Sequence, residues 1–373
     1  MLNKFIFVHL YNDFSGSPRV LADAIECESI PKKDCCIFTS KHIGFLTNLS
    51  VNRVNVFYKR SQSKILQLFY LFFSQLVLFC KLSFLLRKYK KHRFNTYLVV
   101  NTMLPFGGYL AGKLFGVTTI AYVHETAIKP FFFKSFLRFF VESCSNYVFF
   151  VSNYVMGVEG FRKPEQFVIH NGLRSDFNTL HTTDIDYKHK FANKNILFVA
   201  SLKDYKGIHQ YIAIASNLKR FKFTAALNCE YEDLQAFISD NVIPENLDLL
   251  SRPTHLLELY ESAYCVMNLS LPDGWVETFG LSILEGMSYG CPVVVPKVGA
   301  PKEFVSSSFG LLVDARDTDI IIDFILKLDE SFEVWYIKAK NAKEKSLDFS
   351  TENYKRNFLK LMKNIIDDNN ILK

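Results

Sequence analysis

Residues 272–305 read PDGWVETFGLSILEGMSYGCPVVVPKVGAPKEFV, and the order of elements in this segment is the clearest indication of the architecture. A turn at 272–274 is followed by a helical pattern that begins near Thr278 and ends at Gly290, a residue type common just past a helix end. A short apolar strand at 292–296 comes next, and then a second loop that contains Gly299. Loop, helix, strand and loop in this order are typical of a parallel sheet whose ligand-binding loops follow its strands.

The same alternation extends along the chain on both sides of a turn-rich stretch at 169–190. We therefore predict an α/β protein with two doubly wound domains, at 1–178 and 190–348. A last helix is expected in 349–373, with its N-cap at Ser350 or Thr351. Strands are predicted at 4–10, 35–39, 54–58, 96–100, 118–124, 147–152, 195–201, 221–227, 247–251, 265–270, 292–296 and 310–314.

The helix inside 272–305 has features of an anion site. Its N-terminal turn offers the backbone amides of Phe279, Gly280 and Leu281, and helix N-termini bind phosphate oxygens through such groups. Glu277 precedes the helix and Glu285 lies on it, where a carboxylate can accept hydrogen bonds from ribose hydroxyls. The stretch suits a nucleotide-sugar, although a structural alternative has Glu277 as a helix cap and Glu285 as an exposed residue.

A wider motif joins these residues to others. It reads E-x-F-G-x-x-x-x-E, then G-x-P-V-V, then G-x-P-x-E, and it resembles the retaining family-4 glycosyltransferases of GT-B fold. The resemblance implies two Rossmann-like domains facing across a cleft, with the acceptor on the first domain, the donor on the second and a final helix that crosses back. The residues that carry it are Glu277, Phe279, Gly280, Glu285, Gly290, Pro292, Gly299, Pro301 and Glu303.

The resemblance also implies donor-site roles. Glu285 would bind the ribose and Glu277 would contact the transferred sugar, while the amides of residues 279–281 would seat the diphosphate. Lys206, in SLKDYKG, matches the lysine that faces the diphosphate, where a cation stabilises the departing group. The family usually places an arginine five residues earlier, but Ser201 stands there, and Lys203 is a candidate substitute.

Two further positions in the first domain match the family less closely. The loop HLYNDFSGSPRV carries Gly16, with Ser15 where a second glycine is usual, and its amides would lie near the diphosphate or the sugar. His124, in AYVHET, matches a histidine that the family often places at the active site, and it is our second candidate catalytic residue beside Glu277.

The expected function is transfer of a sugar from a UDP- or GDP-sugar to a hydroxyl of a lipid-linked or polysaccharide acceptor in bacterial cell-surface polysaccharide synthesis. Retention of configuration is implied by the resemblance alone. No D-x-D motif stands in the cleft loops, so we expect no metal and no cofactor. The alternative is a catalytically silent, nucleotide-sugar-binding subunit of a polysaccharide assembly complex, a reading to which Ser201 and the single Gly16 lend support.

Two other function classes fit less well. No G-x-G-x-x-G follows a strand, which argues against a nicotinamide dehydrogenase. A nucleic-acid-binding protein would explain a basic first domain, but it leaves Glu277 and Glu285 without a purpose.

Charge is distributed unevenly along the chain. The net charge is +7, yet no Asp or Glu occurs between Asp34 and Glu125, an interval that carries twelve Lys and Arg. The apolar segment 65–86 lies inside this interval, and we predict a helix buried in the domain, with one face available to an anionic membrane, rather than a membrane span. Eight scattered cysteines without a CxxC pair and an N-terminus unlike a signal peptide indicate a cytoplasmic protein. The basic first domain, with Phe-rich segments such as 130–140, predicts a peripheral position on the inner face of the membrane.

Overall fold

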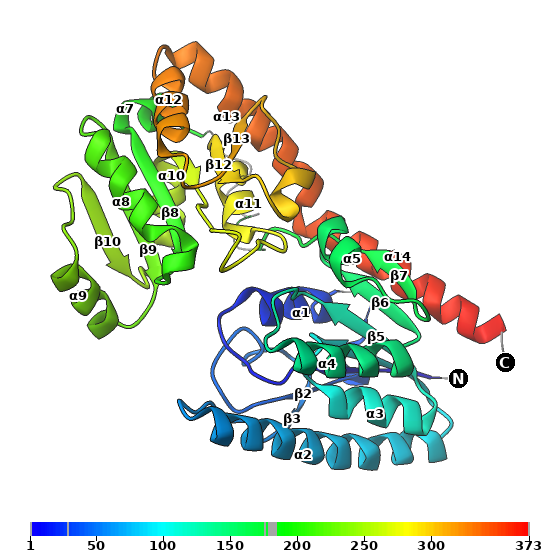
Figure 1. The fold of residues 1–373 in the computed structure, drawn as a ribbon. Coiled ribbons are helices and arrows are strands. Elements are labelled where there is room, and N and C mark those ends of the chain that lie inside the picture. Colours follow the sequence, from blue (N-terminus) through cyan, green and yellow to red (C-terminus); the bar gives the residue numbers. More distant parts are fainter. Residues whose placement is uncertain (1, 28–29, 175–176, 178–184, 372–373) are drawn as a thin grey trace. The chain divides into compact units, whose positions relative to one another are not determined.

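The computed structural model describes residues 2–27, 30–174, 177 and 185–371 (Figure 1). The chain separates into two compact units: unit 1 comprises Met1–Asn171 and Tyr354–Lys373, and unit 2 comprises Gly172–Asn353. The domain boundary predicted at residue 178 lies outside the described residues. Each unit is an α/β body built on its own parallel sheet, as the alternation of strands and helices predicts.

Unit 1 contains a seven-stranded sheet in the order β3-β2-β1-β4-β5-β6-β7. Every neighbouring pair in it is parallel. Its elements are β1 (Asn3–Val8), α1 (Gly16–Ile25), β2 (Cys35–Thr39), β3 (Asn52–Asn55), α2 (Lys64–Lys91), β4 (Asn95–Asn101), α3 (Phe106–Phe115), β5 (Thr118–Val123), α4 (Phe131–Cys144), β6 (Tyr147–Phe150), α5 (Asn153–Glu159) and β7 (Glu165–Val168).

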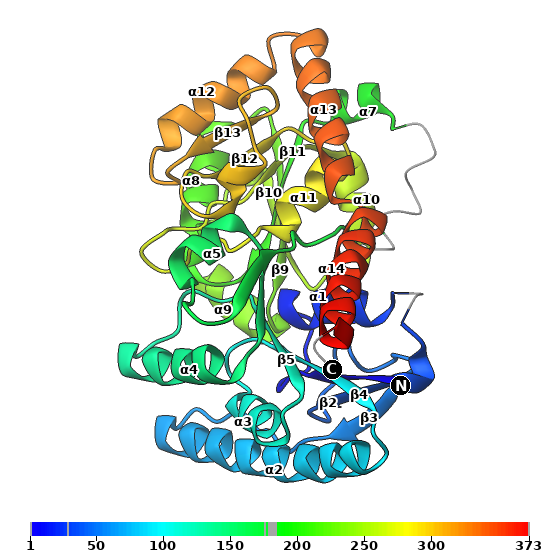
Figure 2. The ribbon, with the colours of Figure 1, turned by 90° about the vertical axis from the view of Figure 1, so that its right-hand side faces the viewer.

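The helices of unit 1 cover both faces of this sheet. Helices α2, α3 and α4 lie side by side over one face, and α1 lies over the other (Figures 1 and 2). The handedness of β-α-β crossovers explains this division, because the chain steps in one direction across the sheet through α2, α3 and α4 and in the opposite direction through α1.

A helix from the far end of the sequence completes unit 1. Helix α14 (Thr351–Ile371) packs into the unit 1 core through residues three or four positions apart, namely Tyr354, Phe358, Met362 and Ile365. The Tyr354 hydroxyl donates to the Val20 carbonyl on α1, at 3.2 Å. The predicted cap is also present, because the Ser350 hydroxyl accepts from the Asn353 amide at 3.2 Å.

Unit 2 contains a six-stranded sheet in the order β10-β9-β8-β11-β12-β13, and its neighbouring strands are also parallel. Short 3₁₀ turns follow β8 and β12, at η2 (Asp204–Lys206) and η3 (Ala300–Glu303). The other elements are α7 (Tyr187–Asn193), β8 (Asn195–Ser201), α8 (Ile208–Asn217), β9 (Lys222–Asn228), α9 (Tyr231–Asp240), β10 (Leu247–Ser251), α10 (Leu256–Ser262), β11 (Ala263–Met267), α11 (Leu281–Ser288), β12 (Val293–Pro296), β13 (Gly310–Val313), α12 (Thr318–Leu328) and α13 (Phe332–Ser346).

Successive side chains of the central unit 2 strands enter two different cores. Ile196 and Phe198 of β8 belong to one apolar cluster, whereas Leu197 between them belongs to the other. In β12, Val294 belongs to the first cluster, whereas Val293 and Val295 belong to the second. The period of two along a strand therefore buries both faces, which is why these segments are continuous apolar runs in the sequence.

Three expectations about unit 1 need correction. The strand predicted at 54–58 lies at Asn52–Asn55, because β3 is an edge strand whose polar residues are tolerated on its open side. Strand β7 was not expected, since EQFV is short and only partly buried at the opposite edge. Helix α2 is longer than the predicted segment, and only 28% of its most apolar window is buried.

Candidate functional site

The strand order of unit 2 reverses between β8 and β11, which are neighbours in the sheet although β9 and β10 separate them in sequence. Loops that follow strands on either side of such a point diverge, and ligands of doubly wound sheets bind there. The loops after β8, β11 and β12 carry Lys206, Glu277 and Gly299, respectively. The candidate site of unit 2 is built from these loops.

The loop after β8 is held against the loop after β11 by a close backbone approach. Gly207 has a φ of +86°, and a Cβ atom there would lie 2.2 Å from the carbonyl oxygen of Leu269. The Leu271 amide donates to the Tyr205 carbonyl at 2.8 Å. A glycine is therefore required beside Lys206, and the pairing fixes the backbone that presents the lysine.

Lys206 and Glu277 form a buried ion pair. The Lys206 Nζ lies 2.6 Å from Glu277 Oε1, and the Ser270 hydroxyl donates to the same oxygen at 2.7 Å. The ammonium group also lies 4.7 Å from the centre of the Trp275 ring. The pair brings together two residues, 71 positions apart, that the sequence predicts to share one site.

The charge of Glu277 is set by this environment. Burial opposes ionisation, but the Lys206 ammonium and hydrogen bonds from Lys206, Ser270 and Asn268 outweigh it, so the pKa of Glu277 lies below its ordinary value. Glu277 is therefore an anion at neutral pH. It can stabilise positive charge, but it has no proton to donate.

A third loop fixes the backbone of Glu277. The Ala300 amide donates to the Glu277 carbonyl at 2.9 Å. Gly299, with a φ of +102°, approaches so closely that a Cβ atom would lie 2.5 Å from the same oxygen. The Gly299 of the G-x-P-x-E segment is thus explained by its contact with Glu277.

Helix α11 begins later than the sequence predicts. Its first residue is Leu281, and Gly280 before it has a φ of +99°, which a right-handed helix cannot contain. The helical amides that face outward therefore begin at Leu281 and Ser282, while the Phe279 side chain packs in the core against Phe304 and Phe349. The predicted end is confirmed, because Gly290 follows the helix with a φ of +66°.

Glu285 lies on α11 and is buried, so the exposed alternative is wrong. Its Oε2 accepts a hydrogen bond from the Tyr260 hydroxyl of α10 at 2.9 Å. Burial, with the nearby Glu285 charge, raises the pKa of Tyr260 well above its ordinary value, so the phenol stays protonated and donates. The sequence gives no sign of this tyrosine, because its 25-residue separation from Glu285 spans a strand and a long loop.

Ser201 stands at the end of β8, and its carbonyl accepts from the Lys203 amide at 2.9 Å. The Lys203 side chain is exposed. That Lys203 replaces the arginine that the resembled family usually has at the position of Ser201 stays a prediction.

The corresponding edge of unit 1 carries a chain of hydrogen-bonded polar side chains. His9, Asn101 and His124 follow or end β1, β4 and β5, which are adjacent strands. The Asn101 Oδ1 lies 2.7 Å from His124 Nε2, and Asn101 Nδ2 lies 2.9 Å from His9 Nδ1. Sequence reasoning found His124 but missed the other two, although each directly follows or closes an apolar strand.

The orientation of the Asn101 amide assigns the histidine tautomers. Asn101 Nδ2 also donates to the Ser17 carbonyl at 3.0 Å, which identifies it as the nitrogen. His124 Nε2 must then carry the proton given to Asn101 Oδ1, and His9 Nδ1 must be the unprotonated acceptor. Burial lowers the pKa of His124 and lowers that of His9 to about 4, so both rings are neutral at pH 7.

Glu125 supports the same edge through backbone contacts. Its carboxylate accepts from the amides of Met103 at 2.9 Å and His124 at 3.1 Å. Burial nevertheless raises the pKa of Glu125.

Gly16 begins α1 and Ser15 is its N-cap residue. The Asp13 carboxylate accepts from both the hydroxyl and the amide of Ser15, the latter at 3.0 Å. The Asn12 side chain, fully buried, fixes this loop by accepting from the Leu46 amide at 3.0 Å and donating to the His42 carbonyl at 2.8 Å. Among the described residues, no group of three or more His, Cys, Asp or Glu is placed to hold a metal ion.

Known proteins resemble this chain at two levels. Residues 193–330 match the family model of glycosyl transferases group 1. Sucrose-phosphate synthase 4 of Arabidopsis thaliana is 33% identical over 103 residues, which are 27% of this chain and 10% of that protein. The chain thus spans only about a tenth of the length of such curated relatives.

Solved structures resemble nearly the whole chain. HepE of Anabaena, crystallised with UDP-glucose, gives a TM-score of 0.77 at 17% identity and covers 97% of this chain and 99% of that one. Sucrose-phosphate synthase of Thermosynechococcus elongatus gives 0.76 at 13% identity, over 99% and 100%. The lipopolysaccharide outer core galactosyltransferase WaaB gives 0.69 at 17% identity, over 95% and 98%. The chain has the GT-B fold of these glycosyltransferases.

Proposed function

We propose that the protein is a retaining, metal-independent glycosyltransferase that uses a UDP- or GDP-sugar and a lipid-linked or polysaccharide acceptor. The observation that carries the proposal is the buried Lys206–Glu277 pair at the strand-order reversal of unit 2. The group 1 match of residues 193–330 and the UDP-glucose complex of HepE support it. The lipopolysaccharide enzyme WaaB supports a role in cell-surface polysaccharide synthesis.

The proposed reaction exchanges one bond at the anomeric carbon for another. The bond from that carbon to the diphosphate oxygen breaks, and a bond to the acceptor oxygen forms on the same face of the sugar. The acceptor proton goes to the departing diphosphate. No net oxidation occurs, and the protein supplies position and charge.

Each group of the candidate site in unit 2 has a distinct role in this reaction. Lys206 supplies positive charge to the diphosphate as it gains negative charge, and the outward amides at the start of α11 supply hydrogen-bond donors. The ionised Glu277 faces the positive charge that develops on the sugar. Glu285, oriented by Tyr260, accepts from the ribose hydroxyls.

In unit 1, His124 is proposed to contact the transferred sugar as a neutral ring. The Asn101 contact engages its Nε2–H, so Nδ1 is the nitrogen with a lone pair for a sugar hydroxyl. Asn101 is a positioning residue, because it acts through His124. We propose a cytoplasmic location, consistent with the eight free cysteines, seven of which are buried.

Calorimetric binding of UDP and GDP, followed by turnover over a panel of UDP- and GDP-sugars in excess chelator, tests the proposal. We expect one nucleotide to bind and one donor to be consumed without added metal. Failure of both nucleotides to bind would overturn the proposal, and a strict Mg²⁺ or Mn²⁺ requirement would overturn metal independence.

A catalytically silent subunit predicts a different pattern. It would bind the nucleotide but consume no donor, and Glu277→Gln would change nothing measurable except stability. For an enzyme, Glu277→Gln abolishes most turnover while nucleotide binding persists, whereas the exposed Glu245→Gln is a matched control without effect.

A further inference from the structure

Helix α2 exposes more apolar surface than a helix of a soluble domain ordinarily does. It is long and apolar enough to cross a membrane, with a mean hydropathy of 1.8 over its best window, yet only 28% of that window is buried. Exposed large residues recur along one side, at Ile65, Phe69, Phe72 and Leu76 with spacings of three or four and again two turns later at Phe84. Such a patch marks a binding surface.

The opposite side of α2 is fixed to unit 1. Gln75 is buried, and its Oε1 accepts from the Gly107 amide of α3 at 3.0 Å. A Cβ atom at Gly107 would lie 2.4 Å from the Gln75 carbonyl, so the two helices touch through their backbones. Buried polar groups with partners on α3 make α2 part of this unit rather than a separate span.

The apolar surface continues from α2 across α3 to α4. Phe72 lies 5.5 Å from Phe106 of α3 and 6.2 Å from Phe136 of α4, between ring centres. Between α2 and α3 is an apolar hollow of ≈ 240 Å³, lined in part by Leu76 and Leu110. On α4, the exposed aromatic residues are Phe131, Phe132 and Phe139.

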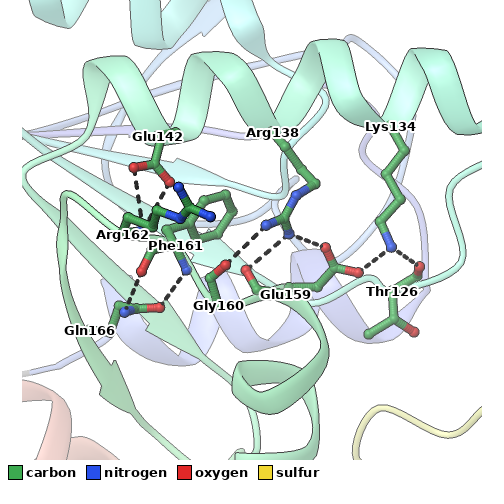
Figure 3. Close-up of polar contacts among 9 residues, drawn as sticks. All are labelled: Thr126, Lys134, Arg138, Glu142, Glu159, Gly160, Phe161, Arg162 and Gln166. Atoms are coloured by element: carbon green, nitrogen blue, oxygen red, sulfur yellow. Dashed lines mark hydrogen bonds and ion pairs between the residues drawn. The ribbon is translucent and has the colours of Figure 1, made fainter.

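Helix α4 is anchored to its own unit by polar contacts of Lys134 and Arg138 (Figure 3). Arg138 donates to the buried Glu159 carboxylate at 2.5 Å and to the Gly160 carbonyl at 2.9 Å. Lys134 pairs with Glu159 and donates to the Thr126 carbonyl at 2.8 Å. These contacts use up the basic residues of α4 and hold the helix rigidly, so little order has to be gained when its phenylalanines bind a partner.

The charge around this surface identifies the partner. The exposed basic residues Lys64, Arg87, Lys88 and Lys91 of α2 have no ion pair within the part of the chain that the structure describes. Arg87 and Lys91 continue the same helical side as Phe84. No acidic residue lies between Asp34 and Glu125 to oppose an anionic partner.

We propose that the docking face, defined as the exposed apolar residues of α2, α3 and α4 with the exposed basic residues of α2, binds the surface of an anionic lipid bilayer. The phenylalanines enter the acyl boundary, and the lysines and arginines contact lipid phosphates. Helix α2 lies in the plane of the membrane. This inference goes beyond the proposed activity and does not depend on it.

Flotation of the purified full chain with vesicles tests the docking face. We expect the protein to float with phosphatidylglycerol-containing vesicles at low salt, at least tenfold more than with pure phosphatidylcholine vesicles. Absence of binding to the anionic vesicles, or equal binding to both, would overturn the proposal.

Two variants locate the binding within the chain. Arg87→Glu/Lys88→Glu/Lys91→Glu and Phe131→Ser/Phe132→Ser/Phe139→Ser should each lower the floated fraction about tenfold or more. The matched control Lys188→Glu/Lys219→Glu/Lys340→Glu makes the same charge change at exposed residues of unit 2 and should float like the unaltered protein. Equal losses in the control and the α2 variant would assign binding to net charge and overturn the proposed face.

Two further measurements separate other occupants. Release of the membrane-bound chain by alkaline carbonate supports surface docking, whereas retention would make α2 a span. Dimers in vesicle-free solution that the phenylalanine variant abolishes would assign the face to a second copy instead. Calorimetry measures nucleotide binding, which is proposed for unit 2, independently of the vesicles. A protein that does not float can therefore be distinguished from one that does not bind a nucleotide.

Discussion

At the scale of single residues, the ionisation of Glu277 depends most on the charge of Lys206, with hydrogen bonds from Ser270 and Asn268 acting in the same direction. Its carboxylate is buried, and Lys206 is the cation that compensates it. The proposed function needs both charges, whereas stability needs them only as a pair. Mutation of one partner and of both therefore separates the two requirements.

We predict that Lys206→Met lowers the free energy of unfolding of unit 2 by about 3–5 kcal/mol, because it leaves Glu277 buried without a cation. Turnover should fall by about 10²- to 10³-fold. Urea unfolding and donor-consumption assays measure these effects. The double variant Lys206→Met/Glu277→Gln should regain much of the stability but none of the turnover, and additive losses of stability would contradict the pairing.

The pH dependence of unit 2 should reverse sign in the same variant. Because the pKa of Glu277 is lowered, its stabilising contribution exists above the ordinary value of 4.5 and is lost as the pH falls through its folded pKa. In Lys206→Met, burial acts without the cation and raises that pKa, so stability is lost instead as the pH rises through 4.5. Unfolding curves at pH 4 and pH 7 compare the two proteins.

His9 predicts a second dependence in unit 1, of the same sign as that of Glu277 in the unaltered protein. Burial lowers the pKa of His9 from 6.5 to about 4. Between these two pH values, the unfolded chain therefore binds a proton that the folded unit does not bind. His9 alone should cost unit 1 about 3 kcal/mol as the pH falls from 6.5 to 4, and the buried His124, whose pKa is also lowered, adds to this loss. Amide exchange in β1 and β4 measures this loss. His9→Gln should weaken the dependence, leaving the part due to His124, while the exposed His209→Gln should not change it; an unchanged profile in His9→Gln would refute the assignment.

Gly207 is predicted to be irreplaceable in the donor site. Gly207→Ala combines a positive φ with a Cβ that would lie 2.2 Å from the Leu269 carbonyl, so the loops after β8 and β11 must separate. We expect a loss of about 2–3 kcal/mol in thermal unfolding and weaker nucleotide binding. Gly157→Ala is the contrasting control, since nothing lies within 4 Å of the added atom and the residue is helical; it should be neutral or stabilise by up to about 1 kcal/mol.

At the scale of elements, the strands with apolar runs were predictable and the edges were not. Strands such as β4 and β8 are buried on both faces, so their composition alone marks them. Strands β3 and β7 lie at sheet edges, where polar residues such as Arg53 and Glu165 are tolerated. The sequence predicts too early a start for α11, because only the backbone conformation of Gly280, and not its residue type, reveals that the helix begins after it.

The candidate site was predictable where one loop carries the residues and not where distant elements meet. Glu277, Glu285 and Gly280 lie in one motif, and Lys206 follows an obvious strand. Tyr260, Ser270, His9 and Asn101 act only through contacts that the folded sheets create. No periodicity in the sequence encodes such contacts.

Helix α14 is predicted to stabilise unit 1 although residues 172–353, which form unit 2, separate the two parts of unit 1 in the sequence. Phe358 is fully buried and its ring lies 6.2 Å from Phe149 of β6. Phe358→Ala should lower the stability of unit 1 by about 3–5 kcal/mol, measured by amide exchange in β6. The exposed Lys360→Ala on the same helix should leave it unchanged.

At the scale of the whole molecule, the two units have separate cores and separate halves of the candidate chemistry. A donor nucleotide at about 100-fold its dissociation constant should stabilise the unit that binds it by about 2.7 kcal/mol. We predict that UDP or GDP slows amide exchange around β8 and α11. Slower amide exchange confined to unit 1 would contradict binding of the donor nucleotide to unit 2.

The chain enters and leaves unit 2 at neighbouring points. The Leu173 amide donates to the Phe349 carbonyl at 2.8 Å, and the Thr351 hydroxyl donates back to the Leu173 carbonyl. Unit 2 is therefore a continuous cassette, residues 172–353, clasped at its two ends. Under the proposed function, exchange of this cassette between related enzymes would need only two adjacent crossover points and would combine a new donor specificity with an unaltered unit 1.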